Sequence, residues 1–124
     1  MAWDVILVDE VNYWYLALLD RESETAELVA AAIDVLAEVG PALGRPLADR
    51  IEGSRLNNLK ELRPGSQGQS EVRILFVFDP KRQAVLLVAG DKSGRWTDWY
   101  KLNIPLAEER YELWLSGKYD EEIG

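Results

Sequence analysis

Hydrophobic residues recur at intervals of three and four over residues 23–39, which is the spacing of an amphipathic helix. A shorter apolar-rich segment at residues 11–19 precedes it after a polar break. Gly40-Pro41 ends the longer pattern, because neither residue extends a helix well. The two segments predict an antiparallel helical hairpin near the N-terminus. The residues that set the longer spacing are Val29, Ala32, Ile33 and Leu36.

Four other segments are short, rich in β-branched or aromatic residues and bounded by turn-forming residues, which predicts strands. The clearest is 71–79, where alternate apolar residues face one side. The segment at 83–89 is apolar on both sides, so we expect it to lie centrally in the sheet. The predicted strands are 3–9, 59–63, 71–79 and 83–89.

The remaining segments complete the predicted topology. Residues 41–57 are rich in Gly and Pro and predict a loop, and Ile104-Pro105 is expected to open a last helix. The predicted order is β-α-α-β-β-β-α. Helices grouped before a run of sequential strands indicate an α+β fold with a mainly antiparallel sheet. We expect one domain over residues 1–115, followed by a polar, acidic tail at 116–124.

The composition excludes several kinds of chemistry. The chain contains neither cysteine nor histidine, which removes disulfides, a thiolate nucleophile, the commonest general base and the commonest zinc ligands. No spacing of carboxylates suggests a metal site, so no metal or cofactor is expected. No apolar run approaches the ~20 residues of a membrane span, and no basic signal-peptide region precedes one. These features predict a cytoplasmic protein that does not enter the membrane.

Charge is distributed unevenly along the chain, whose net charge is −8. Residues 1–40 carry nine acidic residues and one basic residue. Residues 41–101 carry seven acidic and eleven basic residues, and residues 102–124 carry six and two. The total argues against nonspecific binding of nucleic acid over the whole surface. The basic middle segment is where we expect a site for an anion.

Basic residues follow the predicted sequential strands and the loops just after them. If those strands pair in order, Arg63, Arg73 and Lys92 converge on one region of the sheet. Arg73 interrupts a strand that is otherwise apolar, so its side chain must be paired or point into a concave site. The basic residues of this region are Lys60, Arg63, Arg73, Lys92, Arg95 and Lys101.

Each candidate also has a purely structural interpretation. Arg73 could form an ion pair with Glu61 or Asp91, and Glu61 could simply fix the neighbouring bases. Lys92 could be a solvated turn residue. Tyr100, expected just before the last helix, could serve only in packing, as could its neighbour Trp99.

The order and spacing of four segments resemble the RelE/ParE toxin superfamily and, within it, the HigB-like, phage Gp49-related branch. The resemblance covers roughly residues 3–115. It includes the aspartate-bounded first strand and the helical hairpin. The four segments are NLKELR at 58–63, VRILFVFD at 72–79, VLLVAGDK at 85–92 and WYKLNIPLA at 99–107.

The resemblance implies the toxin of a toxin–antitoxin pair, a ribosome-dependent endoribonuclease that cleaves mRNA in the decoding site. It also implies a helix-turn-helix antitoxin that blocks the toxin and represses the shared operon, so that DNA is contacted only through the antitoxin. By position, Arg63, Arg73 and Lys92, with Lys60 next, match the basic residues that hold the scissile phosphate. Tyr100 matches an aromatic residue that stacks on a base or carries a proton.

This chemistry is compatible with the composition. RNA supplies its own nucleophile, the 2′-OH, so cleavage needs a proton acceptor, stabilisation of charge on the phosphorus and a proton donor. Arg63 and Arg73 suit the stabilising role, because their guanidinium groups make forked contacts to phosphate oxygens. Lys60 or Lys92 can serve as the base only if neighbouring cations lower its pKa.

An alternative function uses the same fold. The resemblance includes ParE-type proteins, which act on DNA gyrase, so the fold alone does not define the target. The chain would then be a protein-binding toxin or a co-repressor without nuclease activity. The net charge of −8 favours this alternative, because an acidic surface repels RNA.

Overall fold

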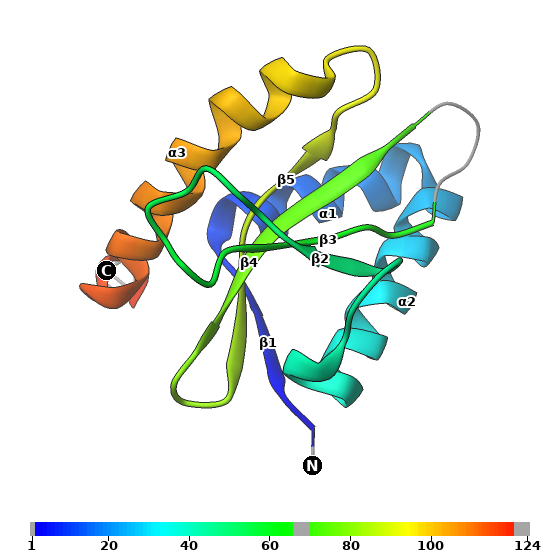
Figure 1. Cartoon of the computed structure of the whole chain (residues 1–124). Helices are drawn as coiled ribbons and strands as arrows, with labels where there is room; N and C mark the ends of the chain where they lie inside the picture. The colour runs from blue at the N-terminus through cyan, green and yellow to red at the C-terminus, as the bar shows by residue number, and fades with distance from the viewer. Residues whose placement is uncertain (1, 66–69, 121–124) are drawn as a thin grey trace.

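The computed structural model describes residues 2–65 and 70–120, and it contains three α-helices and a five-stranded sheet within these ranges (Figure 1). The tail predicted at 116–124 is described only in part, and residues 121–124 lie outside the described ranges. The elements are β1 (Asp4–Leu7), α1 (Asp9–Arg21), α2 (Ser23–Val39), η1 (Gly40–Ala42), β2 (Ala48–Arg50), β3 (Lys60–Leu62), β4 (Val72–Asp79), β5 (Gln83–Asp91), α3 (Trp96–Leu115) and η2 (Lys118–Asp120).

The sheet has the order β1-β5-β4-β3-β2. β1 runs parallel to β5, whereas the other three neighbouring pairs are antiparallel. The fold is therefore α+β with a mainly antiparallel sheet, which confirms the prediction. β5 has a strand on each side, as its uniformly apolar sequence predicted. The helical hairpin is also present as α1 and α2.

Helices cover both faces of this sheet. α1 and α2 lie behind the sheet in Figure 1, and they contact β5 and β1. α3 crosses the other face, where Trp114 donates a hydrogen bond to Asp79 of β4 and Arg110 donates one to the carbonyl oxygen of Leu87 in β5. Alternate residues of each strand therefore face different helices.

Two details of the predicted topology are wrong. The loop predicted over 41–57 contains β2, which pairs with β3 alone at the edge of the sheet. A strand of three residues is too short to establish an alternating pattern, so only its pairing with β3 reveals it.

The last helix begins at Trp96 rather than at Ile104, and Pro105 lies inside it. A proline in a helix interior removes one hydrogen bond and costs about 3 kcal/mol. Burial of Trp99 and Ala107 on either side of Pro105 offsets this cost. Trp99 and Tyr100 are therefore helical residues, and they do not precede the helix.

None of the helices in the described part of the chain is both long enough and apolar enough to cross a membrane.

Candidate functional site

A buried carboxylate, Glu61 of β3, is the centre of a polar cluster between the sheet and α3. Its side chain is 5% exposed. Oε2 of Glu61 accepts hydrogen bonds from Nε and Nη2 of Arg63, at 3.1 and 2.8 Å. Oε1 accepts a hydrogen bond of 2.6 Å from the Tyr100 hydroxyl and lies 3.8 Å from Nε of Arg73. One carboxylate thus joins three of the residues that the sequence singled out.

Strand register explains why these side chains meet. Glu61 lies opposite Leu75 of β4 and opposite Asp49 of β2. Residues two apart on a strand share a face, so Arg63 and Arg73 point to the same side of the sheet as Glu61. That side is the one that α3 crosses, which brings Tyr100 onto the carboxylate from above.

Arg63 bridges two carboxylates that would otherwise repel each other across the β2–β3 pair. Its Nη2 lies 3.2 Å from Oδ2 of Asp49 and 2.8 Å from Oε2 of Glu61. The hydrogen bond with Glu61 is the main reason why the pKa of Arg63 is raised. The side chain remains 30% exposed, so part of the guanidinium group is accessible from solvent.

Arg73 is more deeply enclosed. Its Nη1 donates a hydrogen bond of 2.8 Å to the carbonyl oxygen of Val72, and its buried Nε has no hydrogen-bond partner. Of the two ion-pair partners that the sequence suggested, Glu61 is the one in contact. Asp91 instead accepts hydrogen bonds from the backbone N–H groups of Glu71 and Ser93.

Lys92, immediately after β5, is a buried cation rather than a solvated turn residue. Its side chain is 8% exposed, and Nζ lies 4.1 Å from the ring centroid of Trp96 and 5.3 Å from that of Tyr100. Oε2 of Glu71 is 4.0 Å away. Burial, and then the charge of Arg73, lower the pKa of Lys92.

Tyr100 is held in its protonated form. Burial is the main cause, and the hydrogen bond and negative charge of Glu61 add to it, so the pKa of Tyr100 rises to about 12. The phenol therefore carries a proton at neutral pH. Its neighbour Trp99 is buried against β5, where a Cβ atom added at Gly90 would lie 3.0 Å from Nε1 of the indole, so Trp99 packs as the structural interpretation expected.

Lys60 is separated from the other candidates. It lies opposite Phe76, on the face of the sheet that looks away from Glu61, and its Nζ is 5.4 Å from the ring centroid of Phe78. Four cations were expected to lie together, and the structure brings together three of them, Arg63, Arg73 and Lys92. The reason is the period of a strand, because Lys60 and Glu61 are consecutive and must point to opposite faces.

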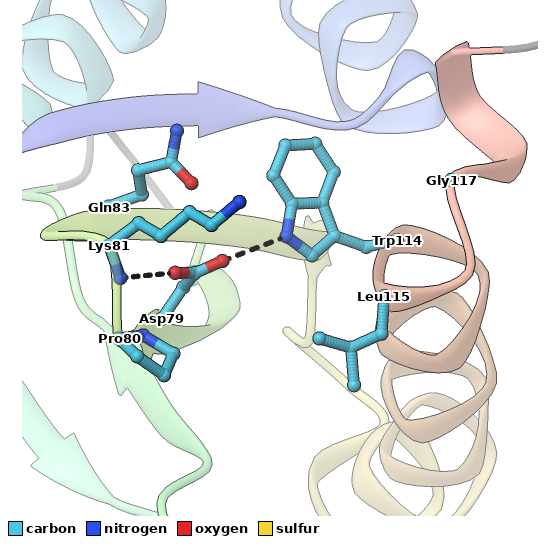
Figure 2. A pocket seen from close by; sticks show the side chains of 7 residues that line it. All are labelled: Asp79, Pro80, Lys81, Gln83, Trp114, Leu115 and Gly117. Atoms are coloured by element: carbon cyan, nitrogen blue, oxygen red, sulfur yellow. Dashed lines mark hydrogen bonds between the residues drawn. The ribbon is translucent and has the colours of Figure 1, made fainter.

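A hollow of about 370 Å³ lies at the C-terminal end of β4, and Asp79, Lys81 and Trp114 are among the residues that line it (Figure 2). Both oxygens of Asp79 are already occupied, by the backbone N–H of Lys81 at 2.6 Å and by Nε1 of Trp114 at 3.1 Å. Asp79 and Arg73 are six residues apart on one strand, about 20 Å. These contacts tie α3 to the β4–β5 turn, and they lie away from the Glu61 cluster.

Comparison with known proteins shows the family to which the chain belongs. Residues 15–112 match the family described as Phage derived protein Gp49-like (DUF891). The chain is 62% identical to toxin HigB2 of Mycobacterium tuberculosis over 104 residues, which are 84% of this chain and 50% of that protein. It is 47% identical to toxin HigB3 of the same organism over 115 residues, which are 93% of this chain and 96% of that protein.

The chain belongs to the Gp49-like family. It spans about half the length of HigB2 and almost the whole length of HigB3. A mutant of the E. coli toxin RelE in the free state has the same fold, with a TM-score of 0.61 and 12% identity over 89% of this chain and 98% of that one. The resemblance to HigB-like, Gp49-related proteins is confirmed, and the fold is shared with RelE.

Sequence reasoning gave the cationic residues of this Gp49-like chain more weight than the groups that balance them. Glu61 and Asp49 neutralise the two arginines, and Glu71 lies beside Lys92. The Glu-x-Arg spacing at residues 61–63 was the available signal, because it puts both side chains on one face of a strand. Trp96, whose ring lies over Lys92, carried no signal in the sequence, since exposed tryptophans occur on many surfaces.

Within the described ranges, no group of three or more carboxylates is arranged to hold a metal ion. Asp49 and Glu61 share Arg63, whose Nη2 contacts both carboxylates.

Proposed function

We propose that this chain is the toxin of a toxin–antitoxin pair and that it cuts mRNA on the ribosome by attack of the RNA 2′-OH on the scissile phosphate. The assignment as a toxin is supported by the sequence similarity of the chain to HigB2 and HigB3, which are named as toxins. The observation that carries the nuclease activity is the gathering of Arg63, Arg73, Lys92 and Tyr100 around one carboxylate. These are the groups that phosphoryl chemistry on RNA requires.

The two arginines bind the phosphate in this proposal. Arg63 is the entry point, because its side chain is the more exposed of the two. A phosphate presents oxygens that compete with Asp49 and Glu61 for the guanidinium fork. Arg73 lies deeper and stabilises the negative charge that develops as the 2′-oxygen attacks the phosphorus.

Proton transfer is divided between Lys92 and Tyr100. Lys92 is the proposed acceptor for the 2′-OH proton, because burial and Arg73 lower its pKa and so increase its neutral fraction. Tyr100 is the proposed donor to the leaving 5′-oxygen, because its pKa of about 12 keeps the phenol protonated. Lys60, on the opposite face, is left to contact a phosphate farther along the strand.

Trp96 must move before RNA can reach Lys92. The ring covers the ammonium group at 4.1 Å, and the lysine side chain is nearly inaccessible. The indole itself is 57% exposed, so displacing it costs little packing. An exposed aromatic ring beside a phosphate site also offers a surface on which a base can stack.

The proposed partners follow from the same assignment. They are a helix-turn-helix antitoxin, mRNA on the ribosome and, through the antitoxin alone, operator DNA, all in the cytoplasm. Two helices offer apolar residues for the antitoxin, with Tyr13 and Leu16 exposed on α1 and Leu102 and Leu115 on α3.

Primer extension along a reporter mRNA tests the proposed activity. The chain is induced in cells that carry one translated reporter and one matched reporter without a ribosome-binding site. We expect cuts in the translated message alone. Arg73→Lys keeps the charge but loses the fork and should reduce cutting, whereas Arg50→Ala, an exposed arginine outside the cluster, should cut like the parent.

Each variant must be folded before its activity is interpreted, so circular dichroism and thermal unfolding accompany the assay. Growth arrest with intact message in the parent would contradict the nuclease proposal. Equal cutting by the parent and by Arg73→Lys, Lys92→Met and Tyr100→Phe would contradict the assignment of these residues.

A second candidate function is a toxin or co-repressor that acts only by binding protein. The observation in its favour is that Glu61 and Asp49 already pair both arginines, in a chain with a net charge of −8. On this alternative the cluster is a structural ion-pair network. Growth arrest that survives replacement of Lys92 and Tyr100, with no cleaved message, is its expected signature.

A further inference from the structure

Glu108, on α3, fastens the loop between β2 and β3 to the helix. Its Oε2 accepts hydrogen bonds from Oγ of Ser54 at 2.7 Å and from the backbone N–H of Arg55 at 2.9 Å. Nε of Arg55 lies 3.5 Å from Oε1 of Glu108, and its Nη2 pairs with Glu112 one turn further on. The side chain of Glu108 is only 14% exposed. We call the contacts of Ser54 and Arg55 with Glu108 the Glu108 contact.

The carboxylate of Glu108 stays charged at neutral pH. Burial alone would raise its pKa, but the hydrogen bonds from Ser54 and from the backbone of Arg55 outweigh burial, so the pKa of Glu108 is lowered. Hydrogen bonds to an ionised carboxylate are stronger than those between neutral groups. The loop is therefore held to the helix by charge-assisted hydrogen bonds throughout the neutral pH range.

The Glu108 contact and the Glu61 cluster join the same two segments of the chain. Arg55 lies six residues before Glu61, on the segment that leads into β3. Tyr100 lies two helical turns, about 12 Å, before Glu108 on α3. The hydroxyl of Tyr100 donates a hydrogen bond of 2.6 Å to Glu61. The two segments are thus joined at one end by the Glu108 contact and at the other by the hydrogen bond between Tyr100 and Glu61.

A hollow of about 310 Å³ lies between the helix and the loop, and residues of both contacts border it. Gly53 lines it from the loop, and Tyr100, Ile104 and Glu108 are among the residues that line it from α3. An open space provides no packing contacts that would hold the helix against the loop. The polar contacts at its margins therefore set the spacing between α3 and the segment that carries Glu61.

The other hydrogen bonds described above between α3 and the sheet lead to different strands. Arg110 donates to a carbonyl oxygen of β5, and Trp114 donates to Asp79 of β4. The Glu108 contact is directed instead at the segment that leads into β3. That strand carries Glu61, the carboxylate that Tyr100 meets.

We propose that Glu108 is a positioning residue, which holds the Tyr100 hydroxyl against Glu61 by fastening the loop in front of β3 to α3. The inference rests on the proposed function, in which Tyr100 gives a proton to the leaving 5′-oxygen. A reacting group that is misplaced by about 1 Å can lose much of its catalytic effect, because the reaction requires the atoms to be in contact. Glu108 therefore influences cleavage through Tyr100, without touching the RNA.

Titration of Tyr100 tests the positioning without any substrate. Isotope labelling of tyrosine Cζ follows the ionisation by NMR, and Tyr100→Phe assigns the signal. Glu108→Ala removes the acceptor, so the hydrogen bond to Glu61 should loosen and the pKa of Tyr100 should fall from about 12 toward its ordinary value of 10.0. Glu108→Gln, whose amide oxygen still accepts from the loop, should retain most of the shift. Glu109→Ala, at the exposed neighbouring position, should match the parent.

Cleavage of a message on purified ribosomes tests the consequence for activity. General acid catalysis contributes about 10²–10⁴-fold, so Glu108→Ala should lower the rate at saturating toxin about tenfold and change the half-saturating concentration less than about twofold. Glu108→Gln should recover most of the rate, and Glu109→Ala should cut like the parent. In Tyr100→Phe, adding Glu108→Ala should cost nothing more, because a residue that acts through another is not additive with it.

The loop side of the contact provides a second variant, which applies even if Glu108→Ala fails to fold. Ser54→Ala combined with Arg55→Ala removes two side chains from half-buried and exposed positions. It should lower the pKa of Tyr100 and the cleavage rate in the same direction as Glu108→Ala. Circular dichroism and thermal unfolding establish that each variant is folded.

The outcomes separate this inference from the function on which it rests. An unchanged pKa of Tyr100 in the folded variants would overturn the positioning role and leave the nuclease proposal standing. A lowered pKa beside a parent that cuts no message would support the positioning of Tyr100 and overturn the nuclease proposal. Equal losses of cleavage from Glu108→Ala in the parent and in Tyr100→Phe would show that Glu108 acts by another route, and would overturn the inference.

Discussion

The two faces of the sheet are made by the same strands but differ in chemistry. The face toward α1 and α2 carries Leu62, Ile74 and Phe76, all fully buried and apolar. The face toward α3 alternates with them and carries Glu61, Arg63 and Arg73 at one end. The positions named on the first face are all apolar, whereas the α3 face combines buried apolar residues, Leu75 and Val77, with a polar cluster.

The difference bears on the proposed function, which uses the polar groups of the α3 face. Burial of apolar area stabilises a fold directly, whereas a buried ion pair rarely contributes more than an apolar pair of the same size would. The carboxylate and the two arginines of the α3 face therefore stabilise the fold no more than apolar side chains of the same size would, although removing one partner is destabilising. Changes on the two faces should therefore differ in their effect on stability and on proton binding, and four predictions test that difference.

The largest expected effect lies on the apolar face. Phe76→Ala should lower the free energy of unfolding by about 3–5 kcal/mol, because it leaves a cavity beneath α1 and α2. A domain of ordinary stability has about 5–15 kcal/mol in total, so this variant should be close to unfolding. Urea denaturation measures the change. Leu102→Ala, which removes an exposed side chain from α3, should change it by less than about 0.5 kcal/mol.

The next effect lies on the polar face. Glu61→Gln removes the charge that balances Arg63 and Arg73, so the free energy of unfolding should fall by about 2 kcal/mol. We expect no larger loss, because Arg63 is partly exposed and water replaces some of the missing interaction. Urea denaturation measures it beside Asp49→Asn. A Glu61→Gln variant as stable as the parent would mean that the cluster is solvated rather than buried.

A pH-dependent effect should follow from Tyr100. Its pKa is raised from 10.0 to about 12, so the folded state holds this proton more tightly than the unfolded chain does. The stabilisation is complete below pH 10 and is lost as the pH rises from 10 through about 12.

Stability measured across that range should fall more in the parent than in Tyr100→Phe, which lacks the titrating group. Equal slopes in the two proteins would show that Tyr100 titrates normally. Tyr13→Phe, at an exposed position on α1, is the matched control and should behave like the parent.

The smallest effect is a shift in the pKa of one lysine. The charge of Arg73 is the second-largest cause, after burial, of the lowered pKa of Lys92. Arg73→Gln removes that charge, so the pKa of Lys92 should rise toward its ordinary value. Titration of the Lys92 side-chain signals by NMR measures the shift, and Arg50→Gln should leave the signals unmoved. An unchanged pKa would mean that burial alone lowers it, and would contradict the prediction.

The sequence predicted the apolar face of the sheet better than the polar face. Alternation in residues 71–79 predicted the apolar face and β4 correctly, because burial imposes a strict period of two on a strand. The same alternation, read from Lys60 to Arg63, would have placed Lys60 away from Arg63 and Glu61. The family resemblance points to the cations alone, and it does not say on which face of the strand each one lies.

The start of the last helix was beyond the sequence pattern for a different reason. Pro105 is a strong local signal for a helix start, and the structure overrides it with the burial of Trp99 and Ala107. That override moves Trp96 and Tyr100 onto the helix. Both rings then lie against Lys92, a contact that a loop would not have fixed.

The sequence by itself determined the helical hairpin, three of the four antiparallel strands, the central place of β5 and the family, because these depend on local period and on the order of short motifs. Tertiary structure alone decided that Glu61 joins Arg73 and Tyr100 and that Lys92 is buried. The physical reason is that ion pairing and burial depend on distances between strands and α3, which strand register sets and which no spacing along the chain encodes.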